Sequence, residues 1–443
     1  MPVPRNRTGN PIIPRPSANG AGSHETNGRL PSPSPKRKKE STPTQQSPKP
    51  RPRPKPKPDL PELAREPDLI AAIRRDLEAV GLVGEQDNGL LTYKIFSSRI
   101  QEKPGAVVTR GASGTGKTTL LNKVAVLFPS DCKIEAMNMS PASWFNTSEV
   151  HFKHKIFLAG ERKHAQDDGS KDAGALLRQL LSERRVNRGV STFDETTKGW
   201  RTEFVEREGP VAYAESTTSG SVFEEDLNRM LQLCVDESEG QTRKVVESIG
   251  SEYDPEKAPV DLKFVIDRHH EFQQSLRPYK VLIPYWKTLA ERLPAKKVEC
   301  RRVAQQVFTV IEAAVLLTQH CRPERDGCLT ATVDDYALAR RLLLAPLHAS
   351  LGVGKDYQNA LRLKAKVRKF VFSTPDVKQA LGFDNDMGPS RLLKGLVEAA
   401  LLVRLTEQKG RTPATYKWAG KAGPDLESMV LPSVAAIREA GFT

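Results

Sequence analysis

The sequence predicts an α/β domain over about residues 60–250, a mostly helical segment up to about 350, and a small third domain after it. Short apolar and β-branched runs alternate with stretches of helical spacing in the first of these regions. A glycine-rich turn joins one such run directly to a helix. Beyond residue 355 the pattern changes to helix, turn, helix and two short strands.

The first elements of the α/β domain lead to the glycine-rich turn. Residues 67–77 have helical spacing with an acidic first turn, and a second helical stretch covers 90–100. The run Ala106–Thr109 is β-branched and ends abruptly at Gly111, which predicts a buried strand that feeds a loop. A helix over 117–128 is expected next.

A hairpin and further strands complete this domain. The elements expected are a strand at 155–158, a helix at 176–183, a hairpin of 186–193 and 202–208, a strand at 211–214, and a helix end that runs into a strand over 227–235. The helices expected between 251 and 350 include 302–319 and 332–344.

The positive charge of the chain is concentrated at its two ends. The 443 residues carry a formal net charge of +14. Residues 1–58 hold 13 Lys and Arg against 2 Glu, with 15 of the 33 prolines, and residues 355–421 hold 14 Lys and Arg against 6 Asp and Glu. The first segment, 1–60, is predicted to be a disordered Pro-rich basic tail, either a polyanion-binding arm or a solubilising spacer.

Several classes of protein are excluded by what the sequence lacks. No apolar run approaches the length of a membrane span, and the basic N-terminus has no apolar signal-peptide core. The five cysteines are scattered without metal-binding spacing, which argues against a zinc site and a disulfide framework. We therefore expect a cytoplasmic protein with no membrane partner.

The segment from Gly111 to Thr118 matches the pattern GxxxxGK[ST] in full. Glycines allow the backbone N–H groups to surround phosphates, and the following helix directs its positive end toward them. Lys117 is expected to reach the β- and γ-phosphates and the Thr118 hydroxyl to ligate Mg²⁺. The nucleotide-binding residues predicted are Gly111, Ala112, Ser113, Gly114, Thr115, Gly116, Lys117, Thr118 and Thr119.

Candidate catalytic residues follow later strands. Glu161 comes directly after an apolar run and could polarise the attacking water, although Gly160 stands where a second acid is usual. A small polar side chain after the strand 211–214, Thr217 or Thr218, could orient that water. Arg229 precedes another apolar run and could act at the edge of a neighbouring subunit.

Taken in order, these motifs resemble AAA+ ATPases with a hairpin before the first sensor. The similarity is closer to ATPase modules of bacterial mobile elements that accompany primases and are distantly similar to minichromosome-maintenance helicases. It runs from about residue 64 to 420. It implies ATP and Mg²⁺ as ligands, a homo-oligomeric ring, and a separate primase or replication protein as a partner. It also implies that Arg229 is the arginine finger, Thr217 or Thr218 the first sensor, and Arg302 or Arg301 the second sensor.

Two regions are candidates for DNA contacts. The hairpin around Lys198 resembles loops with which such ATPases grip DNA, with Arg184, Arg185, Arg188 and Arg201 as further phosphate contacts. In the third domain, Thr374 is expected to cap a helix that ends at Gly382, and a second helix over 389–402 precedes two strands. This pattern predicts a winged helix whose DNA contacts are Arg391, Lys394, Lys409 and Arg411.

The expected organisation is a tail at 1–60, an AAA+ core at 61–250, a helical lid at 251–350, a winged helix at 351–421 and a C-terminal tail at 422–443. The expected function is a DNA-dependent, helicase-like motor or loader that hydrolyses ATP in the replication of a mobile element. The alternative is a nucleotide-switched, winged-helix DNA-binding regulator with little ATP turnover, which Gly160 favours.

Overall fold

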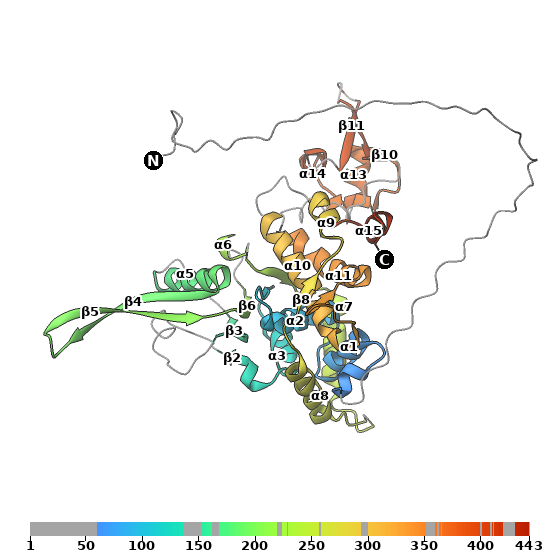
Figure 1. Cartoon of the computed structure of the whole chain (residues 1–443). Coiled ribbons are helices and arrows are strands. Elements are labelled where there is room, and N and C mark those ends of the chain that lie inside the picture. Colours follow the sequence, from blue (N-terminus) through green and yellow to red (C-terminus); the bar gives the residue numbers. More distant parts are fainter. Residues whose placement is uncertain are drawn as a thin grey trace, which may run out of the picture. The chain divides into compact units, whose positions relative to one another are not determined.

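The structure is a computed structural model of the whole chain, shown in Figure 1. It describes residues 60–135, 152–161, 168–218, 224–227, 229–256, 258–293, 300–350, 359–360, 363–364, 366–398, 401–407, 410, 412–419 and 430–442. The expected tail at 1–60 lies almost entirely outside these residues. None of the helices in the described ranges has the length and apolarity needed to cross a membrane.

The centre of the fold is a parallel β-sheet of five strands, so the α/β prediction is confirmed. In sheet order the strands are β2 (Lys133–Glu135), β3 (Lys155–Glu161), β6 (Val211–Thr217), β1 (Ala106–Arg110) and β7 (Leu231–Cys234). All neighbours pair in parallel. The carboxyl ends of the strands therefore share one edge of the sheet, here the carboxyl edge, and their amino ends share the other, the amino edge.

Helices cover both faces of this sheet. One hydrophobic cluster joins one face of the sheet to α1 (Leu69–Ala79), α2 (Gln86–Ser97), α3 (Lys117–Ala125), α8 (Leu262–Ser275), α10 (Cys300–Leu317) and α11 (Val333–Ser350). A second cluster joins the opposite face to α5 (Asp168–Glu183). Alternation along β6 explains the division, because Ala212 and Ala214 enter the first cluster and Val211 and Tyr213 the second.

The helices between 251 and 350 do not have a core of their own. Val307, Ile311 and Val315 of α10 belong to the same buried cluster as Val107 of β1 and Leu233 of β7. The expected boundary at residue 250 therefore separates two stretches of sequence but not two hydrophobic cores.

The end of the chain also packs on this core. A tail was expected over 422–443, but α15 (Val434–Glu439) lies within it and Leu431 and Ile437 are fully buried. The Tyr336 hydroxyl of α11 donates to the Pro432 carbonyl at 2.7 Å. Residues 430–442 are therefore part of the folded unit.

A long antiparallel hairpin lies beside α5 (Figure 1). Its strands are β4 (Arg185–Asp194) and β5 (Gly199–Glu208), paired from Arg185 with Glu208 to Asp194 with Gly199. Both strands are longer than the predicted ones, and Lys198 occupies the turn with a left-handed φ of 49°.

The third domain has its own hydrophobic cluster. Its elements are β10 (Val371–Ser373), α13 (Thr374–Leu381), α14 (Met387–Glu398), β11 (Leu402–Thr406) and β12 (Thr415–Trp418), with sheet order β10-β12-β11. The N-cap of α13 is Ser373, not Thr374 as predicted. Ser373 and Asp376 form a capping box, in which the Asp376 side chain accepts from the Ser373 N–H at 2.7 Å.

The remaining described elements are η1 (Glu62–Arg65), η2 (Ser98–Ile100), η3 (Ser130–Cys132), α6 (Glu224–Leu227), α7 (Glu239–Ser251), β8 (Lys280–Leu282), α9 (Trp286–Arg292), η4 (Gln319–Cys321) and β9 (Cys328–Thr330). Two observed bounds matter for the site. The helix expected from 176 begins at Asp168, and the strand expected to stop at 214 continues to Thr217.

Candidate functional site: a phosphate loop and an arginine pocket

The glycine-rich loop joins the carboxyl end of β1 to the first residue of α3, as the sequence predicts for a phosphate loop. Gly116 has a φ of 86°, in the left-handed region that favours glycine. At Gly111 a Cβ would lie 2.7 Å from a Val235 methyl group, so there is no room for a side chain. By contrast, no atom of the described residues lies within 4 Å of the Cβ position at Gly116, which leaves the inside of the loop open.

Polar contacts fix the shape of the loop from both sides. The Lys117 side chain is buried, and its Nζ donates to the Ala112 carbonyl at 2.5 Å. The Ala112 N–H in turn donates to Glu237 Oε1 at 2.7 Å. The lysine amine is therefore held over its own loop, and Glu237, after β7, anchors the first turn.

The hydroxyl of Thr118 lies at the junction of two neighbouring strands. Its Oγ1 is 3.1 Å from Ser216 Oγ of β6, and the Ser216 hydroxyl donates to the Gly160 carbonyl of β3 at 3.2 Å. The predicted Mg²⁺ ligand thus faces the carboxyl edge, where the candidate water-activating residues also lie.

Glu161 ends β3 at this edge and is exposed. The Thr218 hydroxyl donates to Glu161 Oε1 at 2.9 Å, so these two predicted residues are in contact. The pairing of β3 with β6 shifts register between Leu158 and Glu161, and Gly160 within this irregularity has a φ of 64°. The position where a second acid is usual therefore has a backbone that suits glycine.

Thr217 does not share the environment of Thr118. Thr217 follows Ser216 along β6, so its side chain points to the opposite face of the sheet, where it is buried. Thr218 is the better placed of the two predicted sensor candidates, because its hydroxyl contacts the Glu161 carboxylate.

The loop fits the phosphates of a nucleotide. The space beside Gly114 and Gly116 is open, the loop opens a helix, and a buried amine and a hydroxyl follow it directly. Within the described part of the chain, no group of three or more His, Cys, Asp or Glu side chains could hold a metal ion. Mg²⁺ would therefore be held by Thr118 together with phosphate oxygens and water.

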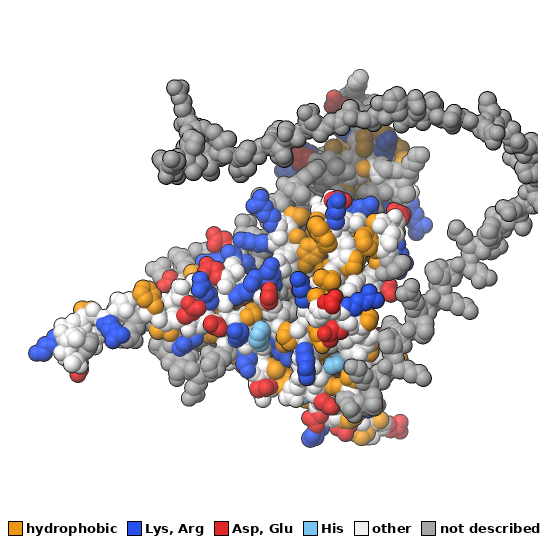
Figure 2. All heavy atoms as spheres, in the orientation of Figure 1, with side chains coloured by type: hydrophobic (Ala, Val, Ile, Leu, Met, Phe, Trp, Pro, Cys, Tyr) orange, Lys and Arg blue, Asp and Glu red, His pale blue; other side chains and the backbone are white. Residues whose placement is uncertain are grey.

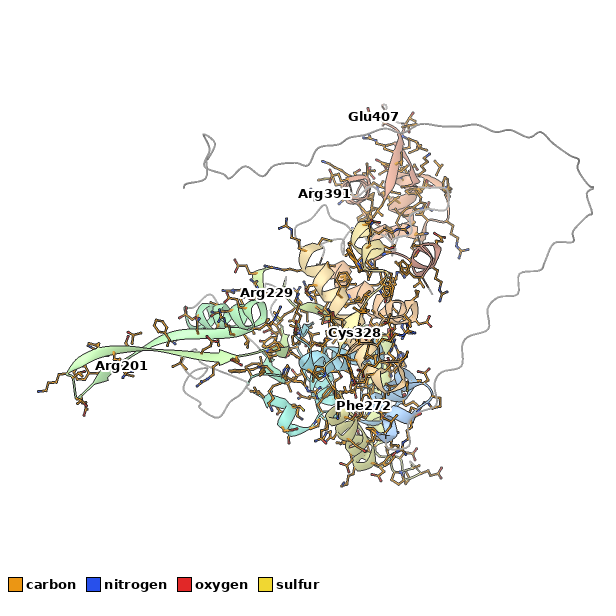
Figure 3. The ribbon with its side chains drawn as sticks, viewed as in Figure 1. Arg201, Arg229, Phe272, Cys328, Arg391 and Glu407 are labelled. Atoms are coloured by element: carbon orange, nitrogen blue, oxygen red, sulfur yellow. The ribbon has the colours of Figure 1, made fainter. Side chains whose placement is uncertain are left out.

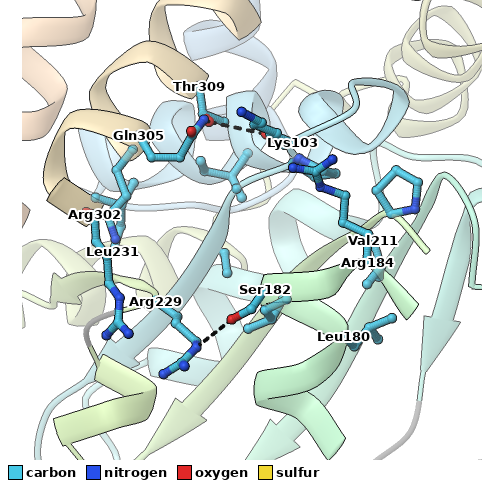
Figure 4. A pocket seen from close by; sticks show the side chains of 17 residues that line it. Lys103, Leu180, Ser182, Arg184, Val211, Arg229, Leu231, Arg302, Gln305 and Thr309 are labelled. Atoms are coloured by element: carbon cyan, nitrogen blue, oxygen red, sulfur yellow. Dashed lines mark hydrogen bonds between the residues drawn. The ribbon is translucent and has the colours of Figure 1, made fainter. Parts of the chain in front are cut away.

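Arg229 and Arg302 line a cavity of about 270 Å³ at the other edge of the sheet (Figure 4). Its wall includes Ala106, Val211 and Leu231, the first residues of β1, β6 and β7. Lys103 and Arg184 complete a cationic lining in which the described residues include no Asp or Glu, and we call this cavity the arginine pocket.

The guanidinium of Arg229 is held in place at this pocket. Its Nε donates to Ser182 Oγ at 2.9 Å, and its Nη1 donates to the Glu225 carbonyl. Burial lowers the pKa of Arg229, and the nearby charge of Arg302 lowers it further. An anion in the pocket would relieve this repulsion.

The arginine pocket is remote from the phosphate loop of the same chain. β1 has five residues, so at about 3.3 Å per residue the two edges of the sheet are roughly 15 Å apart. The structure thus brings Lys117, Thr118, Glu161 and Thr218 together at the carboxyl edge. It brings Arg229 and Arg302 together at the amino edge.

The hairpin carries three exposed aromatic side chains that sequence analysis did not single out. Phe193, Trp200 and Phe204 are 52%, 75% and 84% exposed. Phe193 pairs with Trp200, and Phe204 pairs with Gly189, so all three share one face of the two-stranded sheet. Arg188 and Arg201 lie on the other face, and Lys198 is exposed at the turn. Figure 3 labels Arg201 on the hairpin, and Figure 2 shows Lys and Arg side chains along it.

In the third domain, Arg391 and Lys394 are exposed on α14, and Figure 3 labels Arg391. Lys394 forms an ion pair with Glu398 at 3.8 Å. Lys409 and Arg411 lie outside the described residues.

Two residues near the phosphate loop were also missed. Ser216 contacts Thr118, and Glu237 binds the loop N–H of Ala112. Ser216 could have been found from the polar run after the strand 211–214, because alternation places only every second residue on the Thr118 side. Nothing in the sequence links Glu237 to Ala112, because the contact depends on β7 lying next to β1.

The comparisons with known proteins leave the family open: no protein-family model matches this chain, and no curated protein matches its sequence.

Proposed function

We propose that this chain is an ATP-binding and ATP-hydrolysing P-loop ATPase of the AAA+ type that acts on DNA. The observation that carries the proposal is the open glycine loop between β1 and α3. Lys117 is held over this loop, and Thr118 contacts Ser216, which pairs opposite Glu161. A ligand site at the carboxyl edge of a parallel sheet, next to the central strand, is the usual arrangement in α/β folds.

The residues at this edge would divide the work of phosphoryl transfer. Mg²⁺-bound ATP would supply a phosphoanhydride bond as the substrate. The Lys117 amine would exchange its hydrogen bond with Ala112 for phosphate oxygens, and Thr118 would ligate the metal ion. Glu161 Oε2 would take a proton from water, while Thr218 donates to Glu161 Oε1 and orients the carboxylate.

The arginine pocket supports an active site shared between subunits. Arg229 and Arg302 face the amino edge, so their charges can serve a γ-phosphate only if another copy brings its carboxyl edge to them. This supports the arginine-finger and second-sensor roles proposed for them, and with them a homo-oligomeric ring.

Two surfaces support DNA as the partner. The hairpin combines exposed aromatic rings, on which unpaired bases can stack, with cations that contact phosphates. In the third domain two helices and a three-stranded sheet support a winged helix, with Arg391 and Lys394 on α14 as DNA contacts. We infer a helicase-like motor or loader that works with a replication protein.

The alternative is a nucleotide-switched DNA-binding regulator with little turnover. Gly160 favours this alternative, because it stands where a second acid is usual and its left-handed backbone suits glycine. The acid at the end of β3 is therefore Glu161, without that second acid before it. Steady-state ATPase assays with and without single-stranded DNA distinguish the two: the motor hydrolyses ATP faster with DNA, and the regulator does not.

Nucleotide binding itself is tested with Lys117→Ala. A charge-assisted hydrogen bond contributes about 1.5–3 kcal/mol, so we expect ATP affinity to fall by roughly 10- to 150-fold in calorimetry. The matched control is Lys123→Ala on the same helix, α3, which should bind ATP as the wild type does. Equal affinities for the wild type and Lys117→Ala would refute the nucleotide site.

A further inference from the structure

The arginine pocket gathers positive charge from several elements of the fold. Its charged lining residues are Lys103, Arg184, Arg229 and Arg302. In the view of Figure 4, Arg229 and Arg302 lie on one side of the pocket, and Lys103 and Arg184 lie on the other. Lys103, Arg184 and Arg302 form no ion pair with any residue that the structure describes. A ligand in the pocket would therefore meet positive charge from two sides.

Glu225 and Asp226, whose charges act on Arg229, already pair with another arginine. Arg178 contacts Asp226 at 2.9 Å and Glu225 at 3.5 Å. Burial, followed by the charge of Arg302, still lowers the pKa of Arg229. The described residues thus do not offset the positive charge at this site, and an added anion would.

Arg184 has a backbone conformation that an arginine rarely adopts. It follows α5 with a φ of 59°, in the left-handed region where helices commonly end on glycine. Its N–H donates to the Leu180 carbonyl at 2.9 Å, and its carbonyl accepts from the Gly209 N–H at 2.6 Å. Its half-buried side chain lines the pocket. Unfavourable conformations that the surrounding structure maintains are typical of functional positions, and this one places a cation in the wall.

The rest of the lining suits an organic ligand with a group that forms hydrogen bonds. Ile95, Leu180 and Val211 are buried apolar side chains of the wall. Gln306 also lines the pocket, and its side-chain oxygen is buried without a hydrogen-bond partner among the described residues. Because an amide can present either its oxygen or its NH₂ group, this side chain can bond a ligand donor or a phosphate oxygen.

The size and charge of the pocket limit the class of ligand. Its volume of about 270 Å³ is just below the roughly 300–1,000 Å³ that is typical of small-molecule sites, so the ligand is small. Four cations favour a ligand with about two negative charges. A phosphate monoester carries such a charge near pH 7, whereas a single carboxylate carries one.

We propose that the arginine pocket binds a small phosphate monoester with a ring or another apolar body. The phosphate lies between the cations of the two sides, where the planar guanidinium groups of Arg184 and Arg302 can each bind two of its oxygens. The organic body packs on the apolar wall, and Gln306 gains the hydrogen-bond partner that it lacks. This site is separate from the phosphate loop at the other edge of the sheet.

Occupation of the pocket also regulates turnover, an effect that rests on the proposed function. A monoester bound by Arg229 and Arg302 competes with any other phosphate group for these arginines. It should therefore slow ATP hydrolysis without lowering ATP affinity at the remote phosphate loop. Binding of the monoester itself requires neither ATP nor a second copy of the chain.

Titration calorimetry with phenyl phosphate tests the site, in protein saturated with Mg²⁺ and a non-hydrolysable ATP analogue so that the phosphate loop is filled. We expect one site with a dissociation constant of about 1 mM or below. Inorganic phosphate lacks the ring and benzoate lacks the second charge, so each should bind at least roughly fivefold more weakly. Equal affinity for either of them, or no saturable binding of phenyl phosphate, would overturn the proposal.

Arg184→Gly tests whether phenyl phosphate occupies this pocket. Glycine suits the backbone at this position, so the variant should fold at least as well as the wild type but bind phenyl phosphate roughly tenfold more weakly. The matched control is Lys198→Gly, which also replaces a cation with a left-handed φ, here 49°, but lies outside the pocket lining. It should bind phenyl phosphate as the wild type does. Equal affinities of Arg184→Gly and the wild type would refute the site.

Two further measurements distinguish this site from the proposed function. Loss of ATP-analogue binding in the wild type refutes the nucleotide site, and the comparison with Arg184→Gly still tests the arginine pocket. Steady-state ATPase assays with increasing phenyl phosphate test the regulation, and we expect inhibition that is weaker in Arg184→Gly than in the wild type. Phenyl phosphate that binds in the pocket but leaves turnover unchanged would confirm the site and refute its regulatory role.

Discussion

Glu161 reaches the carboxyl edge of the sheet through a local irregularity of the backbone. The register of β3 against β6 shifts after Leu158, and Gly160 adopts a φ of 64° before Glu161 pairs opposite Ser216. The hydroxyl of Thr218 then holds one carboxylate oxygen, which leaves the other for water. The backbone conformation of Gly160 thus sets the position of the Glu161 carboxylate.

We expect Glu161→Gln to keep ATP binding and to lower turnover by roughly 10²- to 10⁴-fold, the contribution typical of a general base. The amide oxygen can still accept from Thr218, but the side chain can no longer take a proton. The matched control is Glu135→Gln at the carboxyl end of the adjacent strand β2, which should retain turnover. Equal turnover in the Glu161→Gln variant and the wild type would exclude Glu161 as the base.

A buried amine on α2 gives a second prediction at the residue scale. Lys94 is fully buried, its Nζ has no hydrogen-bond partner among the described residues, and burial lowers its pKa to about 7. The unfolded chain, with an ordinary lysine pKa near 10.5, binds more protons than the folded chain between these values. The free energy of unfolding should therefore rise with pH across this window, by up to about 1.4 kcal/mol per pH unit.

Replacing this lysine with an apolar side chain should remove that dependence. We expect Lys94→Met to be more stable than the wild type at pH 7 and to lose most of the rise between pH 7 and pH 10, as measured by urea unfolding. Lys287→Met, on the exposed surface of α9, controls for the loss of one charge. A Lys94→Met protein that keeps the wild-type pH profile would show that another group causes it.

At the scale of elements, the sequence alone predicts a helix or strand where a segment has a clear hydrophobic period or a clear glycine or β-branched pattern. The strand at 106–109, the glycine loop and the helix after it follow from β-branched residues and glycine, and the structure has them within a few residues. The sequence alone does not predict where a strand ends when pairing with neighbouring strands sets its length. β6 continues to Thr217 because β1 and β3 both pair with it, and a pattern of neighbouring residues does not contain those pairings.

The hairpin is the element whose chemistry the sequence described only in part. Its cations were expected, but an aromatic face requires the register that pairs Phe193 with Trp200 and Phe204 with Gly189. That register places the three rings on the side opposite Arg188 and Arg201. A strand of unpaired bases could stack on one side while its phosphates reach Lys198 at the turn.

We expect Trp200→Ala to weaken binding of single-stranded DNA by about 1–3 kcal/mol, or roughly 5- to 150-fold, with a much smaller effect on duplex DNA. Fluorescence anisotropy with labelled oligonucleotides measures both. Trp286→Ala on α9 is the matched control, because that ring is also exposed, at 58%. If both tryptophan variants bind single strands as tightly as the wild type, the aromatic face is not a DNA platform.

At the scale of the whole molecule, the arrangement of residues around the sheet could not be predicted from spacing. The sequence orders the candidates along the chain, but only the parallel sheet shows that Glu161 and Thr218 share one edge and that Arg229 and Arg302 share the other. The sequence also suggested a boundary at residue 250, whereas α10 and α11 are buried against the same core as β1. Long-range packing sets both the positions of these residues around the sheet and the single core across residue 250. Neither can be read from the pattern of neighbouring residues in the sequence.

This division of the site between two edges leads to the last prediction. If Arg229 acts on the nucleotide of a neighbouring copy, Arg229→Ala should bind ATP normally but lose turnover by orders of magnitude. Arg229→Lys should rescue it poorly, because an ammonium group does not reproduce the planar guanidinium that contacts both Ser182 and the Glu225 carbonyl. Lys103→Ala, in the same pocket wall, controls for a general loss of positive charge and should lower turnover far less.

A mixture of Arg229→Ala and Glu161→Gln chains then distinguishes a shared site from a site within one chain. Each variant alone lacks one half of every interface, and the mixture contains some interfaces with an intact Glu161 on one copy and an intact Arg229 on the next. Turnover of the mixture should therefore exceed that of both variants at equal total concentration, and dilution should abolish the gain because the interfaces dissociate. If mixing restores nothing and wild-type turnover per chain is independent of concentration, Arg229 does not act across subunits, and the monomeric nucleotide switch becomes the better account of this protein.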